Sequence, residues 1–382
     1  MDLGLARHYS RFRVAERCLL TGHSHQAWPD VSFDAQQRAW LDAAEFVDEK
    51  WERAAEQTAR VQQGFRRLLN DPDGDIALGQ NTHELVTRLL SALPLGERRK
   101  LVTTDGEFHT IRRQIDRLAE AGLEVVKVRA RPSDTLTDRL ARVVDDRTAC
   151  VLVSSVLYET AEIVPALDIV ARACDHYRAT LLVDAYHHLN VVPFDIAALG
   201  LGAAFVTGGG YKYCQLGEGN AFLRVPPGCR LRPILTGWFS EFAALEESAR
   251  RDRVEYGAGA ARFAGATYDP VSHYRAAAVF AFHVDQELTP ERLRGISRHQ
   301  VGLLKQTFES LDVDPTVARV EPMPDDRRGG FLAIRCARAG KLSRTLRERG
   351  VLTDYRGDLL RFGPAPYLTD DQLREAMLAF PR

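Results

Sequence analysis

The chain has few cysteines and almost no net charge, and these two absences argue against several classes of function. Its six cysteines are scattered over 382 residues without a CxxC pair, which argues against a zinc site or a disulfide framework. The 51 basic and 52 acidic residues leave a net charge of −1. We therefore expect no metal site and no attraction to nucleic acid.

The sequence also lacks any apolar run of about 18 residues, the length needed to cross a membrane. Its amino terminus, MDLGLARHYSRFRVAERCLL, is charged and has no apolar core of signal-peptide length. These two features predict a cytoplasmic protein that does not engage a membrane. With 382 residues, the chain is long enough for two domains and a large core.

What the sequence does contain is an acid and a lysine at the ends of two predicted strands. The apolar run Thr180–Val183 predicts a strand buried on both faces, and Asp184 follows it directly. A second apolar run, 203–207, leads through a glycine triplet, 208–210, to Lys212. The carboxyl edge of a parallel sheet is where open α/β folds bind ligands. Three glycines are expected to let the backbone turn sharply and approach a ligand closely.

An acid and a lysine so placed suit the capture of a carbonyl cofactor such as pyridoxal phosphate (PLP). The lysine amine forms a Schiff base only when neutral, so its pKa must fall well below about 10.4. The acid must face the pyridine nitrogen and keep it protonated. Taken singly, Asp184 can instead cap a turn and Lys212 can be a solvated charge. Their combination behind the glycine triplet favours the cofactor site.

Strands alternate with predicted helices from about residue 75 to Lys212, which indicates an α/β fold with a mainly parallel sheet covered by helices. The strand Ile76–Leu78 ends at a glycine, and a helix begins at Asn81 or Thr82. Free backbone N–H groups at a helix amino terminus bind anions. We therefore expect Asn81, Thr82 and His83 to hold the cofactor phosphate, although Asn81 or Thr82 can also simply cap the helix.

Two further side chains stand at positions that suit ligand binding. Phe108 follows the strand Leu101–Thr104 and can stack on a cofactor ring or belong to the core. Arg361 lies in an apolar strand, LLRF. Its surroundings resemble those of the arginine with which fold-type I PLP enzymes bind the substrate carboxylate through two parallel hydrogen bonds, and a surface ion pair is the alternative.

The segments VDAYHHLNVVPFDI (183–196) and TGGGYKYCQLGEGNAFL (207–223) resemble kynureninases within the class V aminotransferase group. This resemblance implies a fold-type I PLP enzyme with a seven-stranded-type sheet, a smaller α+β carboxyl-terminal domain and a homodimeric assembly. It also implies roles for four residues: Asp184 at the pyridine nitrogen, His187 near the ring, Lys212 as the covalent anchor, and Tyr211 at the phosphate.

The resemblance extends more loosely to other segments. Trp238, in a Gly-Trp pair, would lie by the phosphate, and Thr267, in ARFAGATYDP (261–270), would reach a phosphate that is commonly the partner subunit's. Tyr158, in the loop after strand 149–154, would border the substrate.

The amino-terminal Gly-Asn-Ser-Leu-Gly segment of kynureninases is replaced here by the five residues from Gly22 to Gln26. His23 stands in place of the asparagine, and Ser24 is retained. Both residues are expected at the substrate pocket, with a polar surface loop as the alternative.

We therefore predict an amino-terminal arm (1–30), a large PLP-binding domain (31–270) and a small domain (271–382) that part of the arm joins. The predicted reaction is the hydrolytic Cβ–Cγ cleavage of L-kynurenine, 3-hydroxykynurenine or a related β-substituted amino acid. The alternatives are a class V aminotransferase, an epimerase, a β-lyase, or a binding or regulatory protein that keeps the fold. A cysteine desulfurase is disfavoured because residues 300–330 contain no cysteine.

Overall fold

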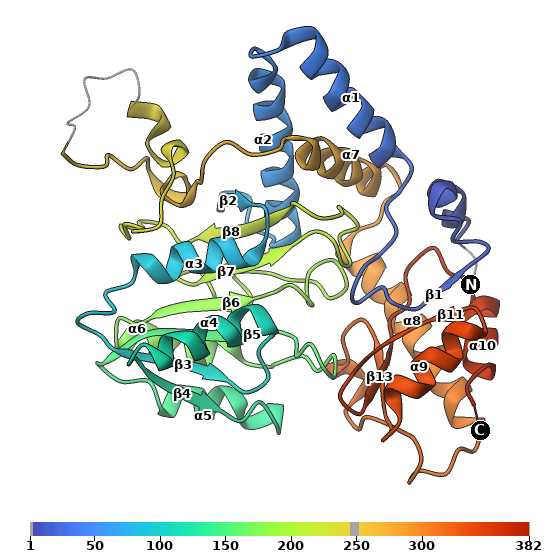
Figure 1. Cartoon of the computed structure of the whole chain (residues 1–382). Helices are drawn as coiled ribbons and strands as arrows, with labels where there is room; N and C mark the ends of the chain where they lie inside the picture. Colours follow the sequence, from blue (N-terminus) through green and yellow to red (C-terminus); the bar gives the residue numbers. More distant parts are fainter. Residues whose placement is uncertain (1–2, 245–251, 382) are drawn as a thin grey trace.

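A seven-stranded sheet forms the centre of the larger of two structural units in the computed structural model, which describes residues 3–244 and 252–381 (Figure 1). The strand order is β2-β8-β7-β6-β5-β3-β4, and β8 runs antiparallel to both of its neighbours. The strands of this sheet are β2 (Asp75–Gly79), β3 (Lys100–Thr104), β4 (Glu124–Val128), β5 (Thr148–Ser154), β6 (Thr180–Asp184), β7 (Phe205–Gly209) and β8 (Ala221–Val225). The expected mainly parallel sheet is thus confirmed.

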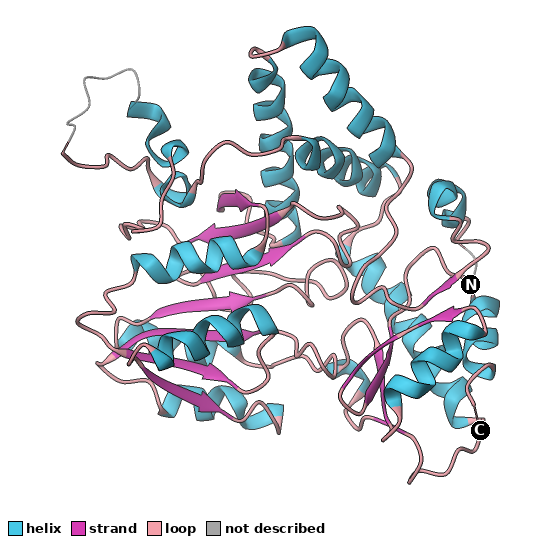
Figure 2. Ribbon diagram, in the orientation of Figure 1, coloured by secondary structure: helices cyan, strands magenta, loops and turns pink. Residues whose placement is uncertain are grey.

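Helices cover both faces of this sheet (Figure 2). On β5, Val151 and Val153 pack against one helical layer, and Cys150 and Leu152 pack against the other, as the two-residue repeat of a strand requires. The first layer consists of α2 (Lys50–Leu68), α5 (Leu136–Arg142), α6 (Leu167–His176) and α7 (Val271–Asp285). The second layer contains α3 (Thr82–Ala92) and α4 (His109–Glu120). In the part of the chain described, no helix has the length and apolarity needed to span a membrane.

The smaller unit is built around an antiparallel sheet with the order β12-β13-β10-β9. Leu5, Tyr9 and Leu20 of the amino-terminal arm belong to its core, so the arm packs with the carboxyl-terminal part of the chain. Its elements are β9 (Arg319–Val320), β10 (Leu332–Arg335), β12 (Asp354–Arg356), β13 (Leu359–Phe362), α8 (Pro290–Glu309), α9 (Ala339–Glu348) and α10 (Asp370–Leu378), with a parallel pair, β1 (Cys18–Leu19) and β11 (Val351–Leu352). The helix α7 contributes to both cores. The domain limits stay a prediction.

The spacing of apolar residues predicts helical structure over 32–69, and the sequence predicts a further helix over 163–178; both predictions are wrong in their extent. The helix expected over 32–69 is two helices, α1 (Val31–Phe46) and α2, separated at Val47, which has a φ of 50°. Trp40 is 71% exposed, so the apolar pattern of this region does not mark one buried face. The helix expected from Ile163 begins instead at Leu167, because Pro165 lacks the N–H that a helix interior needs.

The packing of α7 on α2 depends on the small size of Gly64. A Cβ atom at this position would overlap the ring of Phe280 on α7. The neighbouring Phe65 is fully buried, and its ring centroid lies 5.4 Å from that of Phe280 in an edge-to-face arrangement. Gly302, inside α8, faces open space.

We expect Gly64→Ala and Gly302→Ala to change stability in opposite directions. Alanine favours a helix over glycine by about 1 kcal/mol, so Gly302→Ala should stabilise the protein by up to that amount. At Gly64 the overlap with Phe280 should outweigh this gain and destabilise the fold by about 1–3 kcal/mol. Urea-induced unfolding measures both. Equal stabilisation by the two substitutions would contradict the described contact between α2 and α7.

Candidate active site

A cavity of about 480 Å³ lies at the carboxyl ends of β6 and β7, where the sequence predicts the acid and the lysine. Eight of the predicted site residues line it: Asn81, Thr82, His83, Phe108, Asp184, His187, Tyr211 and Lys212. Gln80, Thr110, Tyr186, Glu218, Gly219 and Asn220 complete its wall. A volume of this size is typical of a site for a small molecule or cofactor.

Lys212 is buried in this wall, with only 5% of its surface exposed. Its Nζ lies 2.8 Å from His187 Nε2 and 5.1 Å from the ring centroid of Phe108. Burial lowers the pKa of Lys212 to about 7; the negative charge of Asp184 opposes this shift, and the positive charge of Arg361 adds to it. Near neutral pH, a large fraction of the amine is therefore uncharged and can act as a nucleophile.

Asp184 and His187 complete the polar group around the lysine. Asp184 ends β6 and accepts a hydrogen bond from the backbone N–H of Tyr186 at 2.8 Å. Burial raises the pKa of Asp184, while this hydrogen bond and the charge of Lys212 lower it. Burial together with the charge of Lys212 holds the pKa of His187 well below its usual range, so the imidazole is neutral.

The amino terminus of α3 forms another part of the cavity wall. Asn81 caps the helix, because its side chain accepts a hydrogen bond from the backbone N–H of Glu84 at 3.0 Å. The same residue lines the cavity together with Thr82 and His83. Capping and anion binding are therefore compatible here: the cap fixes the first turn, and the helix dipole favours a negative group beside it.

Aromatic rings form one side of the cavity. Phe108 directly precedes α4 and lies edge-to-face with Tyr158, with their centroids 5.4 Å apart. Tyr158 also lies 6.4 Å from the His187 ring. Phe108 thus lines the ligand space, whereas Tyr158 contacts Phe108 but does not itself line the cavity.

The expected role of the glycine triplet is wrong. None of Gly208, Gly209 and Gly210 has a positive φ. A Cβ atom would overlap Phe222 at the first position, Tyr186 at the second and Leu216 at the third. The triplet therefore makes room for packed protein side chains. One of these is Tyr186, which itself lines the cavity.

Arg361 and His23 do not line the cavity; they meet at Asp354. Arg361 donates from Nε and Nη2 to the two carboxylate oxygens of Asp354, at 2.8 and 2.6 Å, and from Nη1 to the Tyr158 carbonyl. His23 Nε2 lies 2.8 Å from Asp354 Oδ1. The buried Arg361 is thus paired with a carboxylate of its own chain, that of Asp354, whose side chain is 18% exposed. Ser24 Oγ lies 3.3 Å from Nδ1 of the exposed His25.

Trp238 and Thr267 lie together on the surface, away from the lysine cavity. Trp238 Nε1 lies 3.3 Å from Thr267 Oγ1, and both line an apolar groove against α2. Within this one chain, neither residue borders the pocket that contains Lys212.

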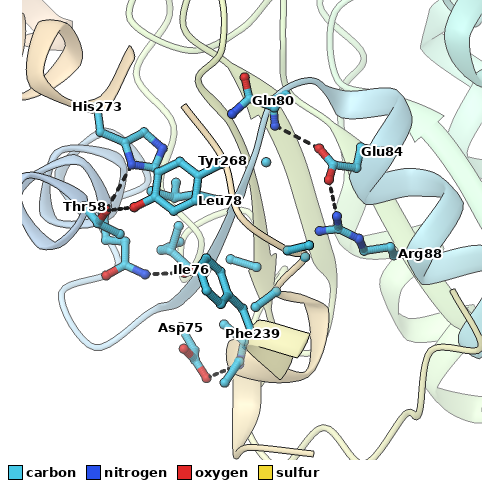
Figure 3. A pocket seen from close by; sticks show the side chains of 18 of the residues that line it. Thr58, Asp75, Ile76, Leu78, Gln80, Glu84, Arg88, Phe239, Tyr268 and His273 are labelled. Atoms are coloured by element: carbon cyan, nitrogen blue, oxygen red, sulfur yellow. Dashed lines mark hydrogen bonds and ion pairs between the residues drawn. The ribbon is translucent and has the colours of Figure 1, made fainter. Parts of the chain in front are cut away.

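Figure 3 shows how the segment next to Thr267 is fixed. Tyr268 and His273 both contact Thr58 Oγ1 on α2, at 2.9 and 3.0 Å. They line a neighbouring cavity of about 380 Å³ that shares Gln80 with the lysine cavity. The backbone N–H of Gln80 donates to Glu84, which pairs with Arg88 (Figure 3). Glu84, in the first turn of α3, therefore fixes the turn that precedes the helix.

The sequence did not reveal two acids near the lysine, one buried and one partly buried. Glu107 accepts hydrogen bonds from the hydroxyls of Thr104 and Ser154 at 2.7 and 2.6 Å, and burial raises its pKa to about 7. It ties the loop that carries Phe108 to the end of β5. Asp354 is the other. Glu107 adjoins the predicted Phe108, but only tertiary contacts show the partners of either acid.

The cysteines add no chemistry to the site. Cys214, two residues from Lys212, is buried in the large core, and burial raises its thiol pKa to about 12. Among the residues that the structure describes, no cluster of three or more His, Cys, Asp or Glu side chains is able to hold a metal ion.

The residues of the cavity fit a PLP molecule. A neutral lysine, a buried acid, an aromatic wall and a helix amino terminus occupy one space of suitable size, and each matches a different part of the cofactor: the aldehyde, the pyridine nitrogen, the ring face and the phosphate.

Comparisons with known proteins agree with this fit. The aminotransferase class-V family model matches residues 44–255, and the kynureninase C-terminal domain model matches residues 293–380. A kynureninase from Bacillus cereus is 27% identical over 307 residues, which cover 75% of this chain and 67% of that protein. An uncharacterized aminotransferase from Bacillus subtilis, YcbU, is 21% identical, with 88% of this chain and 87% of that protein covered.

Solved structures share the fold at low sequence identity. The cystine C-S lyase C-DES superposes with a TM-score of 0.82 at 16% identity, covering 96% of this chain and 97% of that chain. Another C-DES structure, with a TM-score of 0.83, has glycine covalently linked to the PLP cofactor. A cysteine desulfurase from Thermococcus onnurineus has a TM-score of 0.78 at 15% identity, covering 98% and 96%. The fold is therefore fold-type I.

The class-V match spans more than half of the chain and contains Asp184, Lys212 and the first turn of α3. The protein belongs to the aminotransferase class-V family and is a PLP-dependent enzyme.

Proposed function

We propose that the enzyme cleaves the Cβ–Cγ bond of L-kynurenine, 3-hydroxykynurenine or a related β-substituted amino acid by hydrolysis. The observation that carries this proposal is the kynureninase-type carboxyl-terminal domain beside a class-V site with a neutral lysine. Kynureninases also form most of the curated relatives that cover about three quarters of this chain. Transamination is the second candidate, supported by the relative that aligns over 88% of the chain.

PLP, when bound, supplies an electron sink for the negative charge that develops at the substrate Cα. The residues of this chain position and protonate the reactants. Lys212 would hold the cofactor and would take the proton from the substrate Cα at Nζ. Asp184 would keep a proton on the pyridine nitrogen, and the amino terminus of α3 with Tyr211 would bind the phosphate. Phe108 would shield one ring face from water.

The low pKa of Lys212 should set the pH dependence of cofactor attachment. Its pKa is about 7, so the reactive neutral amine predominates above that pH and is lost as the pH falls. The rate constant for PLP attachment to the apoenzyme should be flat above about pH 8 and should fall about tenfold per unit below about pH 6. Stopped-flow absorbance between pH 5 and 10 measures this profile.

Two variants test the assignment of Lys212 as the residue that attaches PLP. Because Asp184 raises the pKa of Lys212, Asp184→Asn should move the midpoint of the pH profile of PLP attachment to lower pH. Lys212→Ala should fold but gain no borohydride-stable cofactor mass, whereas the surface control Lys305→Ala should gain it fully. A midpoint near pH 10, or a stable adduct in Lys212→Ala, would contradict the assignment.

The reaction itself separates the two candidates. With L-kynurenine, the proposed hydrolysis should release anthranilate, detected by its fluorescence, together with an equal amount of alanine. Transamination would instead leave pyridoxamine phosphate on the enzyme and release a keto acid. Detection of the latter pair without anthranilate would reject the hydrolytic proposal.

We further propose a homodimer in which Thr267 reaches the phosphate site of the partner subunit. The groove that contains Trp238 and Thr267 is apolar, has a volume of about 500 Å³ and includes the exposed Phe242. A second copy that covers this groove would remove its aromatic surface from water. It would also explain why two residues expected at the phosphate lie outside the lysine cavity of their own chain.

A hybrid dimer tests this sharing. Thr267→Ala alone should weaken PLP binding at least several-fold by loss of a phosphate hydrogen bond, and Lys212→Ala alone should abolish covalent attachment. Mixing the two variants should restore one intact site per hybrid dimer, because the Lys212→Ala chain supplies its Thr267 to the other chain. Equilibrium binding of PLP and sedimentation velocity measure both outcomes. A monomer, or a hybrid that binds like Thr267→Ala, would contradict the proposal.

A further inference from the structure

Glu107 is a buried acid to which the proposed mechanism gives no role. It stands three residues after Thr104, the last residue of β3, and directly before Phe108, and it is only 1% exposed. It does not line the lysine cavity. A carboxyl group taken out of water in this way depends on hydrogen-bond partners, because burial without them is costly.

Three hydrogen bonds tie the Glu107 carboxyl group to the ends of two neighbouring strands. Oε1 accepts from the Thr104 hydroxyl at 2.7 Å and from the backbone N–H of Ser154 at 3.1 Å, and Oε2 accepts from the Ser154 hydroxyl at 2.6 Å. Thr104 ends β3 and Ser154 ends β5, the parallel neighbour of β3. The carboxyl group therefore fastens the loop after β3 to the carboxyl edge of the sheet.

Stability alone does not account for an acid at this place. In the register of β5 and β6, Ser154 lies opposite Asp184, so two buried acids stand near neighbouring strand ends. Burial, and to a lesser extent the charge of Asp184, raise the pKa of Glu107 to about 7, so its ionised form is costly. A buried charge is weak evidence for a gain in stability. What this acid supplies is two acceptor oxygens in fixed directions, which suits the placement of a loop.

The residue that this tether places is Phe108. Its ring lines the lysine cavity, and the ring centroid lies 5.1 Å from Lys212 Nζ. Glu107 holds the backbone directly before this ring. Because its partner Ser154 lies opposite Asp184, the tether also links the ring to the strand that neighbours the acid of the site.

We propose that Glu107 is a positioning residue that holds Phe108 against the ring face of the cofactor through its contacts with Thr104 and Ser154. The inference rests on the proposed role of Phe108 at the cofactor, and it adds the residue that keeps the phenyl ring there. A gap of about 0.5–1 Å between two packed groups forfeits roughly a quarter to a half of their dispersion attraction. Loss of the tether should therefore weaken cofactor binding through Phe108.

A double-mutant cycle on PLP affinity tests this coupling. The apparent dissociation constant of PLP is measured by titration of the apoenzyme, together with the temperature of thermal unfolding. Glu107→Ala should raise the dissociation constant about tenfold, and the same change in a Phe108→Ala background should raise it less than about threefold, because the ring that the tether holds is gone. Glu107→Gln should stay within about threefold of the wild type, since its amide oxygen still accepts hydrogen bonds from Thr104 and Ser154.

Asp42→Asn is the matched control. Asp42, in α1, is also a buried acid, 3% exposed, and it accepts a hydrogen bond from the Tyr274 hydroxyl at 2.8 Å outside the lysine cavity. Its substitution should lower the unfolding temperature and leave PLP affinity unchanged. Should Glu107→Ala not fold, Thr104→Val and Ser154→Ala each remove one hydroxyl donor of the tether and take its place in the cycle.

Equal effects of Glu107→Ala in the two backgrounds would overturn the inference, as would a lower unfolding temperature with unchanged PLP affinity. An unchanged PLP affinity in Phe108→Ala alone would reject the proposed contact of Phe108 and the inference with it. None of these measurements uses a substrate, so the absence of anthranilate from L-kynurenine would reject hydrolysis without altering the result of the cycle.

Discussion

The burial of one lysine amine is the constraint on which the site depends. Removing Lys212 from water favours its neutral form, and the carboxylate of Asp184 favours its charged form. Burial outweighs the attraction of the acid, so the pKa settles near neutrality. The neutral His187, 2.8 Å from Nζ, adds a polar contact without adding charge. An amine so placed is a nucleophile and a base at the pH of most cells, which is what PLP chemistry requires.

The fold supplies this environment through its sheet. Two neighbouring parallel strands, β6 and β7, bring Asp184 and the lysine loop to one edge, and the turn after β2 brings a helix amino terminus to the same edge. Small residues allow the close packing there, since the glycine triplet accommodates Phe222, Tyr186 and Leu216. Outside the lining of this cavity, His23 of the amino-terminal arm and Arg361 of the smaller unit both contact Asp354.

Much of this was predictable from the sequence because it is local. Short apolar runs ending in Asp184, in a glycine and in the lysine loop define strand ends, and the turn before α3 carries its own capping residue. The long-range part was not predictable. Asp354 and Glu107 gain their partners, Arg361 and Ser154, only through the folding of distant segments onto one another. The exposed Trp40 and the break at Val47 show that apolar spacing alone does not reveal which face of a helix is covered.

A crystal structure of the protein with PLP tests the central claim most directly. We predict continuous electron density from Lys212 Nζ to the cofactor, a carboxylate oxygen of Asp184 within about 3 Å of the pyridine nitrogen, and the phosphate at the amino terminus of α3. Cofactor density attached to another lysine, or a ring nitrogen that faces away from Asp184, would contradict the account.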